Sequence, residues 1–442
     1  MSSSEYREAP DTIVTLNPEP MAPGRDMTLQ PLQSQNTVVP SSDTAGVPTV
    51  PLWAAEPLVL RARRVAQVAA VHAEAVDREA RFPAEAIAAA KAEGLLGVLA
   101  PVELGGEGAS FAQVAEVCYA LGQACASTAM IYAMHQVKVA CVVRHMGDSA
   151  WHQGFIRRLA AEQRLLASST TEGKAGGDVR NSAAAVQGAA QDDGRIRLDR
   201  DASVISYGAH ADGLVTVARR DPDAVSSDQV LLVLERGDYS LALTQTWDTL
   251  GMRGTCSTGF ALQAEADRAQ IMPAPYELIH SRTMVPAAHL FWSSAWAGVA
   301  AGAVERARRF TRKAARSAGG QTPPAAAYVA KAQASLRALI ALIAAGSARF
   351  AAIADDHEAL GDLSFQAAIN LLKVDASELA VTTVMSALRA AGLSGYRNDS
   401  EASLGRHLRD VLSAPIMINN DRILANLAAS SLMAETPDTL FS

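Results

Sequence analysis

The chain has 442 residues, and a chain of this length can bury a large core divided over two or three domains. Hydrophobic residues make up 49% of it but aromatic residues only 5%, which suits closely packed, alanine-rich helices better than a β-sandwich. The formal net charge of -7 and the lack of basic blocks argue against nucleic acid or an anionic membrane surface as a partner.

The cysteines and apolar runs indicate the compartment. Cys118, Cys125, Cys141 and Cys256 have neither CxxC nor metal-ligand spacing, so we expect free thiols and no metal site. No apolar run reaches the ~18 residues that a bilayer span requires, and the N-terminus lacks a signal-peptide pattern. The sequence therefore predicts a soluble, cytoplasmic protein.

The first segment of the chain differs from the rest. Residues 1–50 are rich in Pro, Ser, Thr and Gln, and eight of the 19 prolines lie within the first 51 positions. Such a segment buries too little apolar surface to offset the entropy lost on ordering. We therefore predict a disordered arm over residues 1–50.

Helical periodicity begins after this arm. From Leu58 onward, apolar residues recur at intervals of three and four positions. Ser110, with Gln113 three positions later, matches a capping box in front of a long apolar helix. We therefore predict an N-terminal helical domain over residues 55–165.

The pattern changes twice more along the chain. Around Leu166 it becomes short, alternating and β-branched, which predicts a small β-barrel-like domain over residues 166–278. From Met284 long helical patterns return, and four long helices with short connections predict an up-and-down bundle over residues 279–435, whose last helix covers LRDVLSAPIMINNDRI. The expected fold class is mainly α with a central β-domain.

This domain order and several motifs resemble the acyl-CoA dehydrogenase family. The stretch FPAEAIAAAKAEGLLGVLAPVELGGEG resembles the family's first-domain signature, and TTEGKAGGDVRNS resembles its TEP-x-x-GSD loop. WDTLGMRGTCSTGFAL resembles its LGMRGT-x-S stretch, and AAGLSGY and LRD resemble its GG-x-G-(F/Y) motif and the R-D pair that follows. The likeness covers roughly residues 58 to 430, and the combined order is more specific than any single motif.

The resemblance implies a flavoprotein oxidoreductase, with FAD between the β-domain and the bundle and an acyl-CoA stacked on the flavin. It also implies a homo-tetramer or dimer in which a neighbouring bundle contributes to the FAD site, and an electron-transfer partner. Hydroxyls suit the polar edge of a flavin, and glycines allow close approach of the backbone. The matched cofactor-binding candidates are Thr170, Thr171, Gly176, Gly177, Ser206, Arg316, Arg389, Gly392 and Gly395.

Some positions of the family pattern are changed. The tryptophan two residues before the hydroxyl matched by Ser206 is Val204, and the glutamine and second glycine of the Q-x-x-GG-x-G motif are Arg389 and Leu393. The loop serine before the motif's aspartate is Gly177. We expect these changes to alter how the flavin is held.

The catalytic glutamate of the family is absent. Counted from the R-D pair, its position falls at Ile418, and Asn419 and Asn420 follow. Some family members carry the base on the first bundle helix instead, but the equivalent stretch LFWS at 290–293 contains no carboxylate. A base is required because α,β-dehydrogenation removes the hydrogen α to the thioester carbonyl.

Three hypotheses for the function follow. The first is α,β-dehydrogenation of an acyl-CoA with a relocated carboxylate, for which Asp421, Asp399 and Glu401 are candidates. The second is a monooxygenase that uses O2 and flavin, FAD or FMN, reduced by a separate flavin reductase, as in the dibenzothiophene monooxygenase branch of this fold. The third is a non-catalytic flavin-binding scaffold.

The oxygenase hypothesis assigns its own site residues, and each has a structural alternative. His135 and Ser206 fall at that branch's pocket histidine and serine, and the amides of Asn419 and Asn420 can donate hydrogen bonds to an oxygen. Alternatively, His135 is a satisfied core histidine, Asp421 is solvated, and the asparagines satisfy backbone groups at a helix start.

Overall fold

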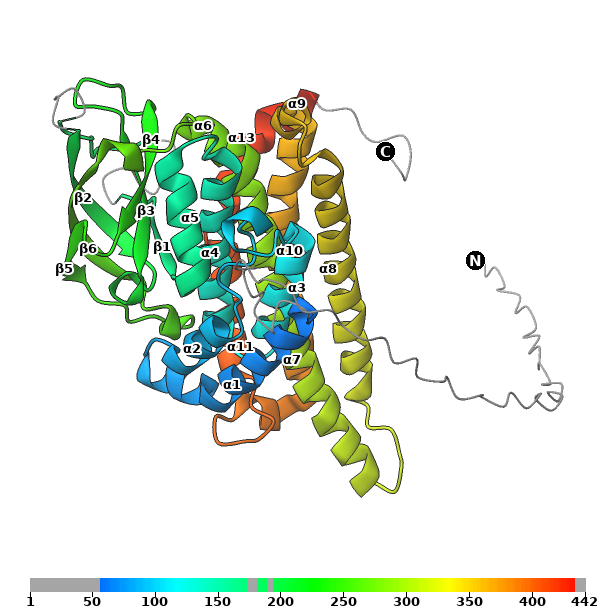
Figure 1. The fold of residues 1–442 in the computed structure, drawn as a ribbon. Coiled ribbons are helices and arrows are strands. Elements are labelled where there is room, and N and C mark those ends of the chain that lie inside the picture. The colour runs from blue at the N-terminus through cyan, green and yellow to red at the C-terminus, as the bar shows by residue number, and fades with distance from the viewer. Residues whose placement is uncertain (1–55, 173–180, 189–193, 434–442) are drawn as a thin grey trace, which may run out of the picture. The chain divides into compact units, whose positions relative to one another are not determined.

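A computed structural model of the chain describes residues 56–172, 181–188 and 194–433. An N-terminal helical part, a β-domain and a helical bundle follow one another along the chain, as the sequence predicts (Figure 1). The predicted arm over residues 1–50 lies outside the described residues.

Five helices form the N-terminal part: α1 (Leu58–Glu79), α2 (Ala84–Ala92), α3 (Phe111–Gly122), α4 (Ala126–His145) and α5 (Ala150–Glu162). The predicted capping box is confirmed, because the Ser110 hydroxyl accepts from the Gln113 N–H at 3.3 Å and the Gln113 side chain accepts from the Ser110 N–H at 2.8 Å. Helix α4 is buried on nearly all sides, which explains why its sequence is apolar throughout rather than along one stripe.

The described β-domain consists of two three-stranded sheets rather than a closed barrel. In the first sheet, of order β1-β3-β4, β1 pairs parallel with β3; in the second, of order β2-β6-β5, all pairs are antiparallel. A register shift in β2 between Ala202 and Ile205 sets Ile205 opposite Thr258. The strands are β1 (Leu166–Ser169), β2 (Arg195–Ile205), β3 (Gly213–Arg219), β4 (Gln229–Glu235), β5 (Tyr239–Gln245) and β6 (Thr258–Asp267).

The bundle contains three long helices, α7 (Val285–Ser317), α8 (Ala326–Ile353) and α10 (Leu363–Tyr396), with the short helices α6 (Tyr276–Ile279) and α9 (His357–Gly361). The prediction of one continuous last helix was wrong. That stretch forms α11 (Gly405–Val411), α12 (Ser413–Ile416) and α13 (Asn420–Met433). The chain breaks before α13 because Ile418 and Asn419 adopt left-handed backbone conformations, with φ of 52° and 56°.

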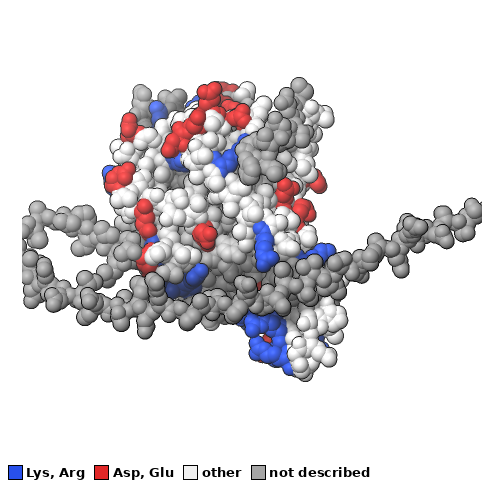
Figure 2. Space-filling view, turned by 90° about the vertical axis from the view of Figure 1, so that its right-hand side faces the viewer, with Lys and Arg blue, Asp and Glu red and all other residues white. Residues whose placement is uncertain are grey.

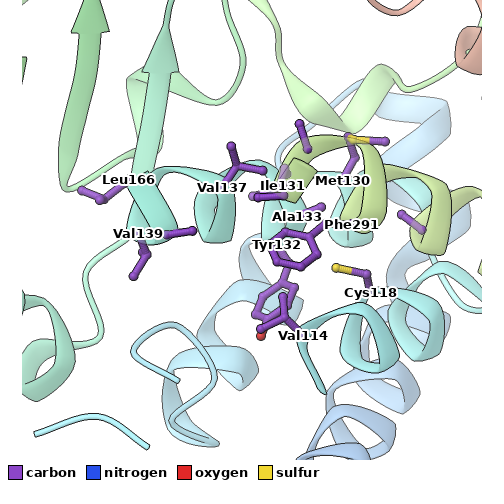
Figure 3. Close-up of a cluster of buried hydrophobic side chains, with 14 of the residues drawn as sticks. Val114, Cys118, Met130, Ile131, Tyr132, Ala133, Val137, Val139, Leu166 and Phe291 are labelled. Carbon is purple, nitrogen blue, oxygen red and sulfur yellow. The ribbon is translucent and has the colours of Figure 1, made fainter. Parts of the chain in front are cut away.

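One apolar core joins the three parts. Figure 3 shows its centre, where side chains of α3, α4, β1 and α7 meet, among them Cys118, Tyr132, Leu166 and Phe291. All four cysteines are free, as expected, and Cys118, Cys125 and Cys141 are buried. Burial raises the pKa of the Cys118 thiol, so this cysteine packs as a small apolar residue.

Helices α3 and α7 approach each other closely through two glycines. A Cβ added at Gly298 would lie 2.8 Å from the Gly122 Cα and would overlap the Tyr119 carbonyl oxygen. Neither glycine can therefore be enlarged without separating the two helices. This contact fixes the position of α7, the helix that carries the 290–293 stretch.

Helix α8 presents an apolar face to the outside. It is long and apolar enough to cross a membrane by length and composition, and 17% of its most apolar window is buried. This differs from the expectation based on run lengths, because the charged residues within α8 are few. Its exposed side is a stripe of alanines at three- and four-residue spacing: Ala334, Ala338, Ala341, Ala345, Ala348 and Ala352.

Candidate flavin site without a carboxylate base

A chain of three hydroxyls marks the bundle-facing end of the β-domain. The Ser206 Oγ lies 2.8 Å from the Ser257 Oγ, which lies 2.7 Å from the Thr255 Oγ1. Thr255 donates its proton to the carbonyl oxygen of Met252 at 2.8 Å. Because the Thr255 proton is already used, Ser257 must donate to Thr255, and Ser206 must then donate to Ser257. The Ser206 oxygen therefore remains available as a hydrogen-bond acceptor. Sequence reasoning nominated Ser206 only, although Thr255 and Ser257 both lie in the LGMRGT-x-S stretch.

The other nominated hydroxyls follow strand β1. Thr170 and Thr171 are half-buried, and the Ser169 Oγ before them is buried without a hydrogen-bond partner among the described residues. Gly176 and Gly177 lie outside the described residues. The Thr170 Oγ1 lies 3.5 Å from the Ser168 Oγ, so the unpaired hydroxyl at this strand end is that of Ser169, and such a group fits the polar edge of a bound ring.

A buried ion pair holds the end of this threonine segment. Glu172 and Arg200 are 2.8 Å apart, with side chains only 4% and 1% exposed. The Glu172 carboxylate also accepts from the Ser182 hydroxyl at 2.6 Å and from the Ala183 N–H at 2.7 Å. A fully paired carboxylate inside the domain fixes the residue next to Thr171.

The catalytic role predicted for His135 was wrong. Its Nδ1 accepts from the Leu166 N–H at 3.0 Å, and its Nε2 donates to the Leu96 carbonyl oxygen at 2.8 Å. The side chain is completely buried, and burial lowers the pKa of His135 to about 4. His135 is thus a neutral histidine that joins α4 to β1 and leaves neither ring nitrogen for a ligand.

The position of the family's base is apolar and open. Ile418 is 40% exposed, and its neighbour Ile416 is 75% exposed. Asn419 caps α13, because its Oδ1 accepts from the Asp421 N–H at 3.0 Å. The helix-capping alternative therefore describes the Oδ1 of Asn419, and the donor role predicted for its Nδ2 stays a prediction.

Asn420 is buried in a polar cluster beneath this segment. Its Oδ1 accepts from the Lys373 Nζ at 2.6 Å, and its Nδ2 donates to the Ser377 Oγ at 2.9 Å and to the Glu378 Oε1 at 3.0 Å. Both donors of its amide are used, so the prediction that Asn420 donates to a substrate was also wrong.

Lys373, which sequence reasoning missed, is the cation of this cluster. It is completely buried, and its Nζ lies 5.7 Å from the centroid of the Trp296 ring. Burial lowers the pKa of Lys373 to about 8. The one sequence signal was a lysine inside the apolar stretch INLLKVDA of α10.

The three carboxylates considered as relocated bases are all on the surface. Asp421 is exposed in the first turn of α13, and Asp399 forms an ion pair with Arg397 at 2.5 Å. Glu401 is 98% exposed and lies 3.9 Å from the Lys313 Nζ. A general base needs a dry position with a tuned pKa, so these assignments are corrected.

The R-D pair of the LRD motif is structural. The Asp410 Oδ1 accepts from the Met252 N–H at 2.7 Å, and Arg409 forms an ion pair with Asp77 of α1. Burial raises the pKa of Asp410 to about 6. Arg409 and Asp410 thereby hold α11 against the LGMRGT stretch and α1. These contacts fix the position of α11, from which the chain continues to Ile418.

The remaining cofactor candidates lie on the bundle. Arg316 is exposed near the end of α7, which projects away from the β-domain (Figure 1). Arg389 lies with its Cζ 4.3 Å from the Tyr328 ring centroid and donates to its hydroxyl at 2.6 Å. Gly392 has a φ of 55° inside α10, a conformation that favours glycine, and Gly395 is buried.

The fold and this site define a class of protein. A small β-domain with a polarised hydroxyl chain, which follows an N-terminal helical part and precedes a helical bundle along the chain, is the arrangement that the resemblance to a flavin-dependent oxidoreductase family implies. Family models confirm it: the acyl-CoA dehydrogenase N-terminal domain matches residues 58–163 and the C-terminal domain matches residues 287–433, together more than half of the chain. The chain therefore belongs to the acyl-CoA dehydrogenase family, which consists of flavoproteins.

Individual relatives extend this result. Cyclohex-1-ene-1-carbonyl-CoA dehydrogenase of Geobacter metallireducens is 25% identical over 364 residues, covering 81% of this chain and 92% of the relative. The fold is similar to FMN-bound TdsC, the dibenzothiophene monooxygenase of Paenibacillus sp. A11-2, with a TM-score of 0.75 and 20% identity over 88% of this chain and 100% of TdsC. Butyryl-CoA dehydrogenase of Megasphaera elsdenii gives a TM-score of 0.72 and 16% identity over 85% of this chain and 97% of that chain.

Proposed function

We propose that this protein is a flavin-dependent monooxygenase that uses O2 and flavin reduced by a separate reductase. One observation carries the proposal: the position of the family's base is occupied by Ile418, and the nominated substitutes Asp399, Glu401 and Asp421 are exposed. Removal of an α-hydrogen cannot proceed without a base. When bound, a reduced flavin supplies the electrons that activate O2, and that chemistry needs no carboxylate.

The residues of this chain fit a flavin. The Ser206 oxygen ends the hydroxyl chain as an acceptor, and the buried Ser169 hydroxyl before Thr170 lacks a partner among the described residues. Ser206, Thr170 and Thr171 would hold the polar edge of the ring. Ile416 and Ile418 present apolar surface on the side where a carboxylate usually stands. TdsC binds FMN, and we propose FMN or FAD here.

α,β-Dehydrogenation of an acyl-CoA is the second candidate, since the relative from Geobacter is a dehydrogenase. Lys373 is the observation in its favour. Its amine lies 2.6 Å from Asn420, two residues after the family's base position, and burial lowers its pKa to about 8. Above pH 8 its amine is mostly neutral and can accept a proton.

One pair of measurements separates the candidates. Anaerobic protein loaded with oxidised flavin is mixed with acyl-CoAs of several chain lengths while absorbance near ~450 nm, a property of the flavin itself, is followed. The monooxygenase proposal expects no bleaching; bleaching that is lost in Lys373→Met but kept in Lys331→Met on α8 would establish the dehydrogenase instead. In the second measurement, reduced FMN or FAD meets O2 with and without the protein. Reoxidation at the rate of free flavin contradicts the proposal.

We also propose a homo-tetramer or dimer, in which a second copy covers the exposed alanine stripe of α8. Small residues at helical spacing permit close contact between helices, and the stripe stays exposed in the single chain. Ala345→Glu should lower the molar mass measured by light scattering, whereas Val71→Glu, at a 78% exposed position of α1, should not. An unchanged mass for Ala345→Glu contradicts this assembly.

A further inference from the structure

A cleft separate from the flavin candidates lies between α1, the C-terminal half of α7 and the segment that leads into α11. Its volume is about 1000 Å³. A second hollow of about 620 Å³ adjoins it, and Glu74 and Arg406 line both. None of Thr170, Thr171, Ser206, Arg316, Arg389, Gly392 or Gly395 lines either space.

The walls of the larger cleft carry an excess of positive charge. Five cations line it, Arg63, Arg306, Arg309, Lys313 and Arg406, against the three carboxylates Glu74, Glu305 and Glu401. In the wider view, Lys and Arg side chains gather on the projecting end of the bundle (Figure 2). An unbalanced cationic wall attracts anions.

Every carboxylate of the cleft already has a cation. Glu305 lies 2.6 Å from Arg308 and 2.7 Å from Arg309, and these two guanidinium groups hold the pKa of Glu305 at about 2. Glu74 pairs with Arg406 at 3.4 Å, and Glu401 lies 3.9 Å from Lys313. Two cations of the lining, Arg63 and Arg306, remain without a carboxylate partner among the described residues.

Arg306 is the more informative of these two cations, because it is half-buried. Its Nη1 donates to the Ser403 carbonyl oxygen at 3.1 Å, and burial together with the nearby Arg406 lowers its pKa. Beside it, the Nδ1 of His407 is buried without a hydrogen-bond partner, in a side chain that is 4% exposed. A partly desolvated guanidinium next to another cation is unfavourable unless an anion compensates it.

The remaining wall combines apolar side chains with the polar residues Gln67, Gln123 and Ser400. Ala66, Ala70, Ala120, Ala124 and Phe310 line the cleft between the charged groups. A guanidinium binds phosphate through two parallel hydrogen bonds, and an alanine-lined surface with one aromatic ring accommodates a flat, uncharged group. Simple inorganic anions would leave most of the volume unfilled.

We propose that this cleft binds a nucleotide-type phosphate ester, with the phosphates on Arg306 and Arg63 and the base against Ala120 and Phe310. This site is additional to the flavin site and does not depend on the reaction that the protein catalyses.

The test is a calorimetric titration of the flavin-loaded protein with ADP. We expect saturable binding that weakens about tenfold in Arg306→Gln, because one charge-assisted phosphate contact is lost. Arg63→Gln, on the exposed opposite wall, should weaken it as well and carries little risk to folding. Arg312→Gln is the matched control, since Arg312 is exposed on the same helix and does not line the cleft. Adenosine should bind much more weakly than ADP.

Three results would overturn the proposal. The first is no binding of ADP by the wild-type protein. The second is an equal affinity in Arg63→Gln, Arg306→Gln and Arg312→Gln. The third is that added FAD displaces ADP completely and that the Arg63→Gln and Arg306→Gln variants bind ADP as tightly as the wild type. ADP would then occupy the flavin site. The flavin absorbance, recorded in each titration, separates loss of cofactor from loss of ADP binding.

Discussion

His135 connects α4 to two backbone groups, so its removal should be costly for folding. In His135→Ala, the Leu96 carbonyl oxygen and the Leu166 N–H lose their partner inside the core. We expect the free energy of unfolding to fall by about 2–5 kcal/mol, measured by urea denaturation. His210→Ala is the control, because His210 only stacks on Phe82 at the surface and should cost much less. A loss no larger than in that control would contradict the structural role.

Lys373 should make the stability depend on alkaline pH. Burial lowers its pKa from 10.5 in the unfolded chain to about 8, so between these values the unfolded chain binds a proton that the folded chain lacks. Stability therefore rises with pH across this window, by at most ~1.4 kcal/mol per pH unit. The measurement is urea denaturation at two pH values, one near each end of the window. The stability of the wild type should rise with pH more than that of Lys373→Met, whereas wild type and Lys331→Met should rise equally. Parallel curves for wild type and Lys373→Met would contradict the buried charge.

Single residues show where sequence reasoning succeeded and where it could not. Motif position nominated Ser206 as a flavin-binding and catalytic hydroxyl; the structure places it at the end of a hydroxyl chain, and the predicted role stays a prediction. Motif position could not show that backbone groups occupy both nitrogens of His135, because Leu96 and Leu166 are distant in sequence. Nor did it reveal Lys373, whose partner Asn420 lies on another helix. Such contacts depend on tertiary packing and leave no local pattern.

At the scale of elements, strand β2 carries two ion pairs that differ in burial. Arg200 pairs with Glu172 inside the domain, whereas Arg197 pairs with Glu265 at 3.0 Å with side chains 70% and 62% exposed. Glu172→Gln leaves a buried guanidinium uncompensated and should cost about 3–5 kcal/mol. Glu265→Gln should cost between about 0 and 1 kcal/mol. Equal losses in thermal or urea unfolding would show that the inner pair is accessible to water.

The crossing of α3 and α7 gives a second prediction for elements. Gly298→Ala forces a methyl group into backbone of α3 and should destabilise the protein by about 1–3 kcal/mol or more. Gly154→Ala, in the middle of α5, meets nothing closer than 3.5 Å and should stabilise it by about 0.5–1 kcal/mol through helix propensity. Melting temperatures should therefore shift in opposite directions. A stable Gly298→Ala protein would mean that the helices can separate.

Elements were predicted well where one periodicity holds over many residues. The capping box at Ser110 and the change of pattern at Leu166 located element starts in the described structure. The prediction failed between α11 and α13, because a left-handed conformation at Ile418 is not favoured by its residue type. The break depends on the contacts of Asp410 and Asn420 with other elements.

The whole molecule should be sensitive to acid, because many of its histidines are buried in the neutral form. Burial lowers the pKa values of His135, His145 and His152 to about 4 and that of His289 to about 3, and lowers that of His407 well below its usual value of 6.5. Below pH 6.5 these histidines bind protons in the unfolded chain but stay neutral in the folded chain. Stability is therefore full above pH 6.5 and falls as pH drops toward 4, by at most ~1.4 kcal/mol per unit for each histidine.

Two carboxyl groups oppose this trend, because burial raises the pKa of Asp410 and that of Asp375. The pKa of Asp410 is raised to about 6, so between its unfolded value of 3.8 and 6 it contributes stability that increases as pH falls. Five histidines outweigh two aspartates, and the urea midpoint should decrease steadily from pH 7 to pH 5. A midpoint that stays constant over this range would mean that the histidines are reached by water.

The left-handed backbone at Ile418 bears on the position of the missing glutamate. A β-branched residue at φ 52° is strained by about 1–3 kcal/mol, whereas glutamate, unbranched at Cβ, would sit there more easily. Replacement of Ile418 by glutamate should therefore relieve backbone strain rather than add to it. The apolar side chain at the position of the family's base is thus held at a conformational cost to folding, and restoring a carboxylate there should not be limited by the backbone.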